Sequence, residues 1–111
     1  MDAIYYGVKK RFANDNRVMV HRKSSREAAA AFPDGTFDWV YIDGDHSYDA
    51  VFNDLVSWKP KSRRGGVLAG DDLNWRDENG SLSVRFAVTS FVKAEGLNVE
   101  ILPQGQFMIK L

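Results

Sequence analysis

The sequence predicts one α/β domain built on a mostly parallel sheet, with an antiparallel hairpin at one edge. Segments of strand length alternate with segments of helical periodicity, which is the order expected of an α/β fold. The segment 37–42 is almost continuously apolar, as in a parallel strand that is buried on both faces. Two short apolar segments close together at the C-terminal end indicate the hairpin.

The first third of the chain is expected to contain a helix, a strand and a second helix. Apolar residues recur at helical spacing within 2–13 and stop at an Asn-Asp-Asn sequence. Residues 17–21, Arg-Val-Met-Val-His, then form a short strand. The second helix begins at Ser24 or Ser25 with a capping-box sequence and ends before the Pro-Asp-Gly turn at 33–35.

The middle of the chain is expected to contain two parallel strands joined by one helix. The strand 37–42 ends in a polar sequence, and a helix follows over 48–58. An Arg-Gly-Gly turn at 64–66 leads into a second apolar strand, 67–70.

A helix and the hairpin complete the predicted fold. After a polar loop at 73–81, an amphipathic helix begins near Val84 and is closed by Gly96. The strands 97–102 and 107–111 are separated by only four residues, so they are expected to pair with each other.

Composition excludes several classes of protein. Lysine and arginine together number 15, as do aspartate and glutamate, so the formal net charge is zero. Nucleic-acid and membrane-surface partners favour a basic excess, so neither is expected. The lack of cysteine excludes disulfides, thiolate metal sites and cysteine nucleophiles. No apolar stretch approaches the roughly 20 residues that span a bilayer, and no signal peptide begins the sequence, so a cytoplasmic location is expected.

Carboxylates follow both strands of the predicted parallel pair. Asp43 and Asp45 follow the first strand, and Asp71 and Asp72 follow the second. Because the carboxyl ends of neighbouring parallel strands meet at one edge, the four acids are expected to converge there. Such a cluster repels itself unless a cation such as Mg²⁺ intervenes, and His46 beside it is a candidate general base. A lone acid at a strand end more often has only a turn or capping role.

The segment 37–73, FDWVYIDGDHSYDAVFNDLVSWKPKSRRGGVLAGDDL, resembles class I, Rossmann-like, S-adenosylmethionine-dependent methyltransferases. It is most similar to the small-molecule and sugar O-methyltransferases related to macrocin and cephalosporin tailoring enzymes, the methyltransferase domain family 24 type. Upstream, KKRFANDNRVMVHRKSSREAA looks like the third strand of that family and its following helix. The resemblance therefore covers nearly the whole chain.

The resemblance implies a role for individual residues. Its metal ligands fall on Asp43, Asp71 and Asp72, and its base falls on His46. Its cofactor-binding positions fall on Ser25, Arg26 and Asp43. The implied cofactors are S-adenosylmethionine and Mg²⁺. The loop 73–80 would face the acceptor, where Trp75 is a candidate contact for an aromatic or sugar ring.

The resemblance also implies that residues 1–111 are a single truncated methyltransferase-like domain. A complete domain begins with a strand, a glycine-rich loop and a second strand, and this sequence has no counterpart of them. Those strands would lie between 17–21 and 37–42, so either these two segments pair directly or another chain fills the gap. A homo-oligomer or a partner chain is therefore expected to cover the exposed sheet edges.

Two functions follow from these expectations. The first is Mg²⁺-assisted O-methylation of a small molecule or sugar by S-adenosylmethionine, although this chain alone is not expected to be active. The alternative is a non-catalytic fragment or subunit that needs a partner chain or an oligomer to complete the fold. A metal-dependent phosphoesterase is disfavoured because such sites need several histidines and the sequence has only His21 and His46.

Overall fold

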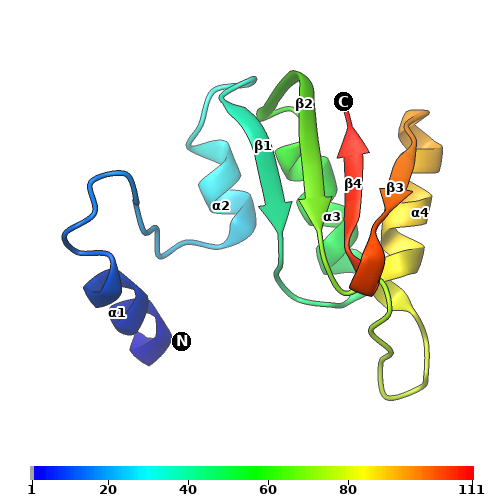
Figure 1. Ribbon diagram of the computed structural model, residues 1–111, viewed down its shortest axis with the longest axis horizontal. Coiled ribbons are helices and arrows are strands. Elements are labelled where there is room, and N and C mark those ends of the chain that lie inside the picture. Colours follow the sequence, from blue (N-terminus) through cyan, green and yellow to red (C-terminus); the bar gives the residue numbers. More distant parts are fainter. Residues whose placement is uncertain (1) are drawn as a thin grey trace.

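The computed structural model describes residues 2–111, and its centre is a four-stranded sheet in the order β1-β2-β4-β3 (Figure 1). The strands are β1 (Phe37–Ile42), β2 (Ser62–Gly70), β3 (Val99–Ile101) and β4 (Phe107–Lys110). The helices are α1 (Asp2–Arg11), α2 (Ser25–Ala30), α3 (Tyr48–Trp58) and α4 (Ser83–Glu95), with a short 3-10 turn, η1 (Pro103–Gly105). None of the described helices is long and apolar enough to cross a membrane.

The strands β1 and β2 are parallel neighbours, as the sequence predicted. Val40 lies opposite Leu68, and Ile42 lies opposite Gly70. The two strands therefore end side by side. Gly70 is required at this end, because a Cβ atom there would lie 2.5 Å from the Phe107 ring and 2.7 Å from the Ile42 carbonyl oxygen.

The strand β2 begins five residues earlier than predicted. The expected turn at 64–66 is instead an irregularity inside the strand, where the register with β1 shifts between Phe37 and Trp39. Gly65 has a φ of 79°, a conformation that glycine adopts without steric cost. The turn prediction was wrong because glycines that bulge a strand and glycines that reverse a chain look alike in sequence.

The sheet is mixed, which corrects the prediction of a mostly parallel one. Only β1 and β2 are parallel, whereas β4 pairs antiparallel with both β2 and β3. The β3–β4 hairpin is the one that the sequence predicted. The parallel part is small because the predicted strand at 17–21 does not join the sheet.

Residues 17–21 form no strand because local hydrogen bonds hold their beginning in a turn. The Asp15 carboxylate accepts from both the backbone and the side chain of Arg17, at 2.9–3.0 Å. The Val18 amide donates to the Asp15 carbonyl at 3.1 Å. Such side-chain contacts compete with strand pairing. Among the described residues, none pairs with the outer edge of β1, so the direct pairing of 17–21 with 37–42 does not occur.

The core lies between the sheet and the helices α3 and α4. Leu55, Leu68, Phe91 and Ile109 are each 0% exposed within it. Figure 1 shows α3 and α4 behind the sheet, α2 beside the outer edge of β1, and α1 standing further to one side. Because side chains alternate along a strand, the opposite face of β1 carries Trp39 and Tyr41, which are exposed.

Candidate metal and active site

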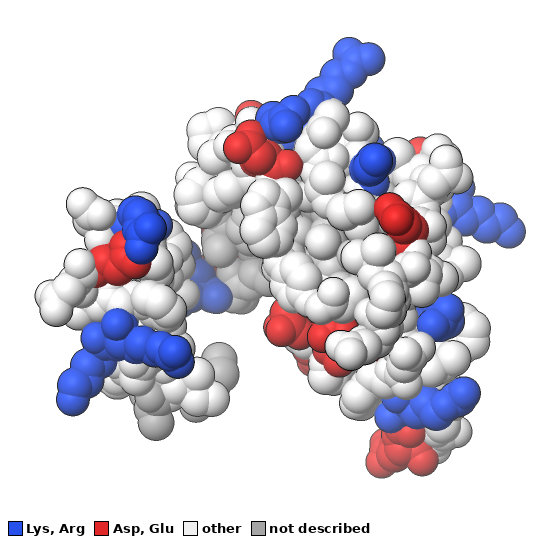
Figure 2. Space-filling model, viewed as in Figure 1, with Lys and Arg blue, Asp and Glu red and all other residues white. Residues whose placement is uncertain are grey.

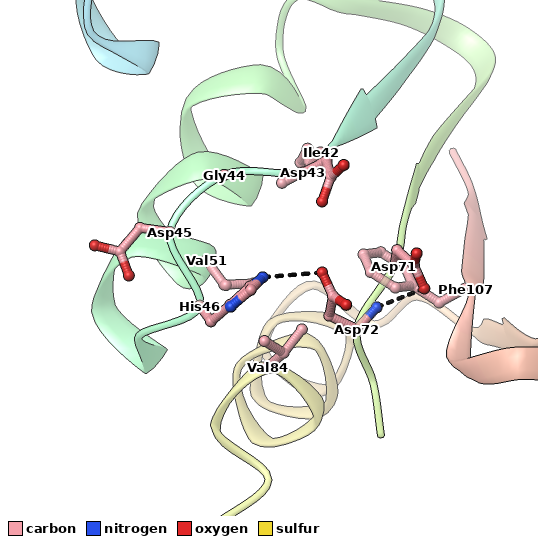
Figure 3. Close-up of a pocket in the computed structure, with 10 residues that line it drawn as sticks. All are labelled: Ile42, Asp43, Gly44, Asp45, His46, Val51, Asp71, Asp72, Val84 and Phe107. Carbon is pink, nitrogen blue, oxygen red and sulfur yellow. Dashed lines mark hydrogen bonds and ion pairs between the residues drawn. The ribbon is translucent and has the colours of Figure 1, made fainter. Parts of the chain in front are cut away.

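Three predicted site residues converge where β1 and β2 end. Asp43 follows β1, His46 lies in the loop before α3, and Asp72 lies two residues beyond β2. One ligand atom from each lies within 4.8 Å of the other two. The closest pair is His46 Nε2 and Asp72 Oδ2 at 2.9 Å (Figure 3). The convergence expected from the parallel pairing is therefore present for these three residues.

The loop that carries His46 is held by the start of α3. The Ser47 hydroxyl accepts from the Ala50 amide at 3.2 Å, as an N-cap does. The Asp45 carboxylate accepts from the Ser47 amide at 2.9 Å. In Figure 3 the Asp45 side chain points away from Asp43 and Asp72. The expectation that all four acids converge was wrong for Asp45, because its carboxylate has a capping role instead.

The two acids after β2 have different surroundings. Asp72 has a φ of 70°, a backbone conformation that is uncommon for a residue with a Cβ atom. This conformation turns its carboxylate toward His46. Asp71 lines the same pocket, but its Oδ1 accepts from the Asp72 amide at 2.7 Å and it is not one of the three convergent groups. Uncommon backbone conformations concentrate at functional sites.

His46 is fixed from three sides. Its ring donates to Asp72, its carbonyl accepts from the Ser83 hydroxyl at 2.9 Å, and its ring lies 4.7 Å from that of Trp75. When Nε2–H donates to the carboxylate of Asp72, the neutral imidazole has its free lone pair on Nδ1. Nδ1 is then the nitrogen that can accept a proton.

The pocket between these groups fits an ion and no organic molecule. Its volume is ≈ 10 Å³, which is about the space that one water needs. Two carboxylates and one imidazole suit a divalent cation, with oxygen ligands favouring Mg²⁺ and a nitrogen ligand admitting Mn²⁺ or Zn²⁺. An organic ligand needs the larger hollow of ≈ 850 Å³, which Asp43 and Gly44 also line.

The acidic residues at the end of the sheet affect the pKa of the nearby Tyr41 phenol. Partial burial raises the pKa of its phenol, and the negative charges of Asp71, Asp43 and Asp72 raise it further. A hydrogen bond with Gln106 acts in the opposite direction. The phenol is therefore neutral near physiological pH, and the carboxyl end of the sheet is a region of negative potential.

Of the two predicted cofactor positions on α2, Ser25 borders the larger hollow and Arg26 does not. Ser25 lines this hollow together with Asp43. Its hydroxyl accepts from the Trp58 indole at 2.7 Å, which ties α2 to α3. Arg26 is exposed at the next position of the helix and is not part of the lining.

The sequence did not indicate which residues support His46. Ser83 is 37 residues away and is an ordinary helix-start residue in sequence. Trp75 was noted only as a candidate acceptor contact, whereas its ring lies against His46. The sole signal was the position of Trp75 three residues after an acidic strand end.

A family model for a methyltransferase domain, Methyltransf_24, matches residues 5–73. This match spans more than half of the chain and includes α2, β1, α3, β2 and all of the predicted site residues. No curated protein sequence matches the chain.

Solved structures share the fold at low sequence identity. A Corynebacterium glutamicum protein superimposes with a TM-score of 0.70 at 18% identity, over 95% of this chain and 53% of that one. A Staphylococcus aureus protein assigned as a caffeoyl-CoA O-methyltransferase superimposes with a TM-score of 0.68 at 15% identity, over 96% of this chain and 57% of that one. CalS11, a TDP-rhamnose 3′-O-methyltransferase of calicheamicin biosynthesis, superimposes with a TM-score of 0.58 at 16% identity, over 80% of this chain and 37% of that one.

The chain thus spans only about half the length of the first two of these structures. The chain therefore resembles part of a methyltransferase fold, with a mixed sheet of four strands. From the family match and this fold, the chain belongs to the methyltransferase domain family.

Proposed function

We propose that this chain provides the metal and base site of an S-adenosylmethionine-dependent O-methyltransferase that acts on a small molecule or sugar with the help of Mg²⁺. The observation that carries this proposal is the convergence of Asp43, His46 and Asp72 within 4.8 Å. The family match supports methyl transfer. Two structural relatives are O-methyltransferases by name, which supports a hydroxyl acceptor.

The carboxylates and the histidine have separate roles in this proposal. Asp43 and Asp72 would hold the cation, and Asp71 would assist from the same pocket. Bound Mg²⁺ supplies Lewis-acid chemistry that lowers the pKa of an acceptor hydroxyl. His46 takes the proton at Nδ1, while Asp72 orients the imidazole through Nε2–H.

The organic ligands occupy the hollow beside the pocket. S-adenosylmethionine supplies the methyl group when bound. Ser25 and Asp43 line this hollow and would contact the cofactor, with Arg26 next to Ser25 on α2. Trp75 is 36% exposed next to His46, so its ring can bound the space that the acceptor enters.

A second candidate function is that of a subunit whose site is completed by another chain. The specific observation in its favour is that no described residue pairs with the outer edge of β1, which lines the same hollow as Ser25. Cofactor binding that needs an added chain would favour this candidate.

Calorimetric titration of S-adenosylmethionine into the purified chain, with and without Mg²⁺, tests the proposal. Micromolar binding followed by transfer of labelled methyl to hydroxyl acceptors would support an enzyme. Absence of binding at any protein concentration would favour the second candidate.

The His46 assignment is tested in an assembly that shows methyl transfer. His46→Ala should lower turnover by roughly 10²–10⁴-fold, because the proton acceptor is lost. Its Mg²⁺ affinity should remain close to that of the unmodified protein. A large loss of affinity would instead make His46 a metal ligand, and unchanged turnover would remove it as the base.

A further inference from the structure

The first residue of α4 directs its hydroxyl away from its own helix. The helices α2 and α3 are each preceded by a serine whose hydroxyl accepts from a backbone amide, as an N-cap does. The start of α4 has no such side-chain cap. Instead, the Ser83 hydroxyl donates to the His46 carbonyl oxygen at 2.9 Å, across 37 residues of sequence. This hydroxyl therefore holds the loop that follows β1.

Two residues later, Arg85 holds the loop that follows β2. Its guanidinium donates from Nε to the Leu73 carbonyl oxygen at 3.3 Å and from Nη2 to the Asn74 side-chain oxygen at 3.0 Å. The fixed fork of a guanidinium lets one side chain make both bonds at once. From the other side, the Leu73 amide donates to the Gly105 carbonyl oxygen at 2.9 Å. The segment 73–74, here called the anchored segment, is therefore held between α4 and the η1 turn.

The anchored segment lies between two residues that contact the His46 ring. Asp72 comes immediately before it and bonds Nε2 of His46 at 2.9 Å. Trp75 comes immediately after it, with its ring 4.7 Å from that of His46. Asp72 has a φ of 70°, which persists only when the surrounding structure supports it. A change in the path of the anchored segment would therefore move both neighbours of the imidazole.

The tip of the loop, residues 76–81, is closed by hydrogen bonds of its own. The Asp77 carboxylate accepts from the Asn79 amide at 2.9 Å and from the Ser81 amide at 2.8 Å. The loop protrudes at the lower right of Figure 1, and Figure 2 shows acidic and basic side chains exposed on it. A tip that is closed on itself keeps its shape even when the whole loop moves. The position of Trp75 therefore depends on the anchored segment.

We propose that Arg85 is a positioning residue for the His46 base, and that Ser83 assists it from the same turn of α4. Arg85 fixes the anchored segment, which sets the Trp75 ring and the Asp72 carboxylate against the imidazole. Ser83 fixes the loop that carries this imidazole. The use of this geometry in methyl transfer rests on the proposed function. The geometry itself can be measured without metal, cofactor or acceptor.

Proton NMR of the histidine rings in the full chain, at constant pH, tests this proposal. The sequence contains only two histidines, His21 and His46. The ring current of Trp75 shifts the His46 resonances, and Trp75→Leu measures the full size of that shift. Arg85→Met keeps a good helix former but removes both donors, so it should abolish most of the shift. The His21 resonances and the amides of β2 should stay unchanged, which a general loss of structure would not allow.

Three further variants make the NMR result decisive. Arg64→Met removes the same charge from an exposed position near the amino end of β2 and should leave His46 unchanged. Arg85→Lys keeps the charge and one donor, so it should restore part of the shift. If Arg85→Met does not fold, Asn74→Ala takes its place, because it removes one acceptor without altering α4. An unchanged His46 resonance, or an equal change in Arg64→Met, would overturn the proposal.

The positioning role and the proposed function fail in different measurements. Absence of Mg²⁺ or S-adenosylmethionine binding by the unmodified chain would count against the proposed function, while the NMR shifts still decide the role of Arg85. In an assembly that shows methyl transfer, Arg85→Met should lower kcat by up to about 10²-fold, because the base is misplaced. KM should stay close to that of the unmodified enzyme. An unchanged kcat would overturn the positioning role.

Discussion

The sheet body, residues 37–111, and the N-terminal segment, residues 2–24, both contain apolar residues at helical spacing, but their packing is very different. In the body, Leu55 and Phe91 are 0% exposed. In the N-terminal segment, Ile4 is 71% exposed and Met19 is 77% exposed. The comparison teaches that periodicity identifies residues suited to burial, whereas burial itself depends on a partner that the pattern does not specify.

The difference bears directly on function. The body fixes Asp43, His46 and Asp72 through strand pairing and the capped start of α3. The N-terminal segment leads into Ser25 and Arg26 and borders the larger hollow. The metal half of the proposed site is therefore preorganised, while the organic half depends on what covers β1 and the N-terminal segment.

The largest expected contrast is between apolar-to-alanine substitutions in the two regions. Phe91→Ala should lower the free energy of unfolding by about 3–5 kcal/mol, because it leaves a cavity in the core. Met19→Ala should change it by no more than about 0.5 kcal/mol, because that side chain is exposed. Urea denaturation followed by circular dichroism measures both. A comparable loss for Met19→Ala would show that the N-terminal segment is packed in solution.

Two glycines give a smaller contrast. Gly70→Ala should cost about 1–3 kcal/mol, since its Cβ would overlap Phe107 and the β1 backbone. Gly7→Ala in α1 has no atom within 4 Å of the new Cβ, so it should favour the helix by about 0.5–1 kcal/mol. Thermal unfolding and helix content are the measurements. Equal stability of the Gly70→Ala and unmodified proteins would contradict the close approach of β1, β2 and β4.

The smallest expected effect concerns the turn at Asp15. Its hydrogen bonds with Arg17 lower the pKa of the Asp15 carboxyl below its ordinary value of 3.8. The turn is therefore stabilised above that value, and the contribution is lost as the pH falls through the lowered pKa. Asp15→Asn should speed hydrogen exchange at the Arg17 amide near neutral pH and leave amides of β2 unchanged. Slow exchange at Arg17 in the variant would show that another contact holds the turn.

Sequence patterns predicted the body well where local signals agreed. The bounds of β1 and α3 match the predicted ranges 37–42 and 48–58, because a continuous apolar run and an N-cap serine mark them. The prediction of a strand at 17–21 was wrong, because the Arg17 amide that would begin it donates to the Asp15 carboxylate instead. The parallel character of the sheet was overestimated for the same reason.

The site was predictable only in part. The rule that neighbouring parallel strands end at the same edge of a sheet correctly predicted that Asp43 and Asp72 lie close together, because it depends only on the pairing of β1 with β2. The same rule could not show that Asp45 lies apart from the cluster, because its carboxylate accepts from the Ser47 amide. Nor could it predict the hydrogen bond from the Asp72 amide to the Asp71 carboxylate. The supports of His46 come from Trp75 and Ser83, whose approach depends on the path of the 73–82 loop.

The most direct test of the central claim is calorimetric titration of Mg²⁺ into the chain and two matched variants. Asp43→Asn should lose about tenfold or more in affinity, because one of the convergent carboxylates is removed. Asp45→Asn removes the same charge but keeps an oxygen to cap Ser47, so its affinity should stay close to that of the unmodified chain. Equal losses in the two variants, or no Mg²⁺ binding by the unmodified chain, would contradict a metal site at Asp43 and Asp72 beside His46.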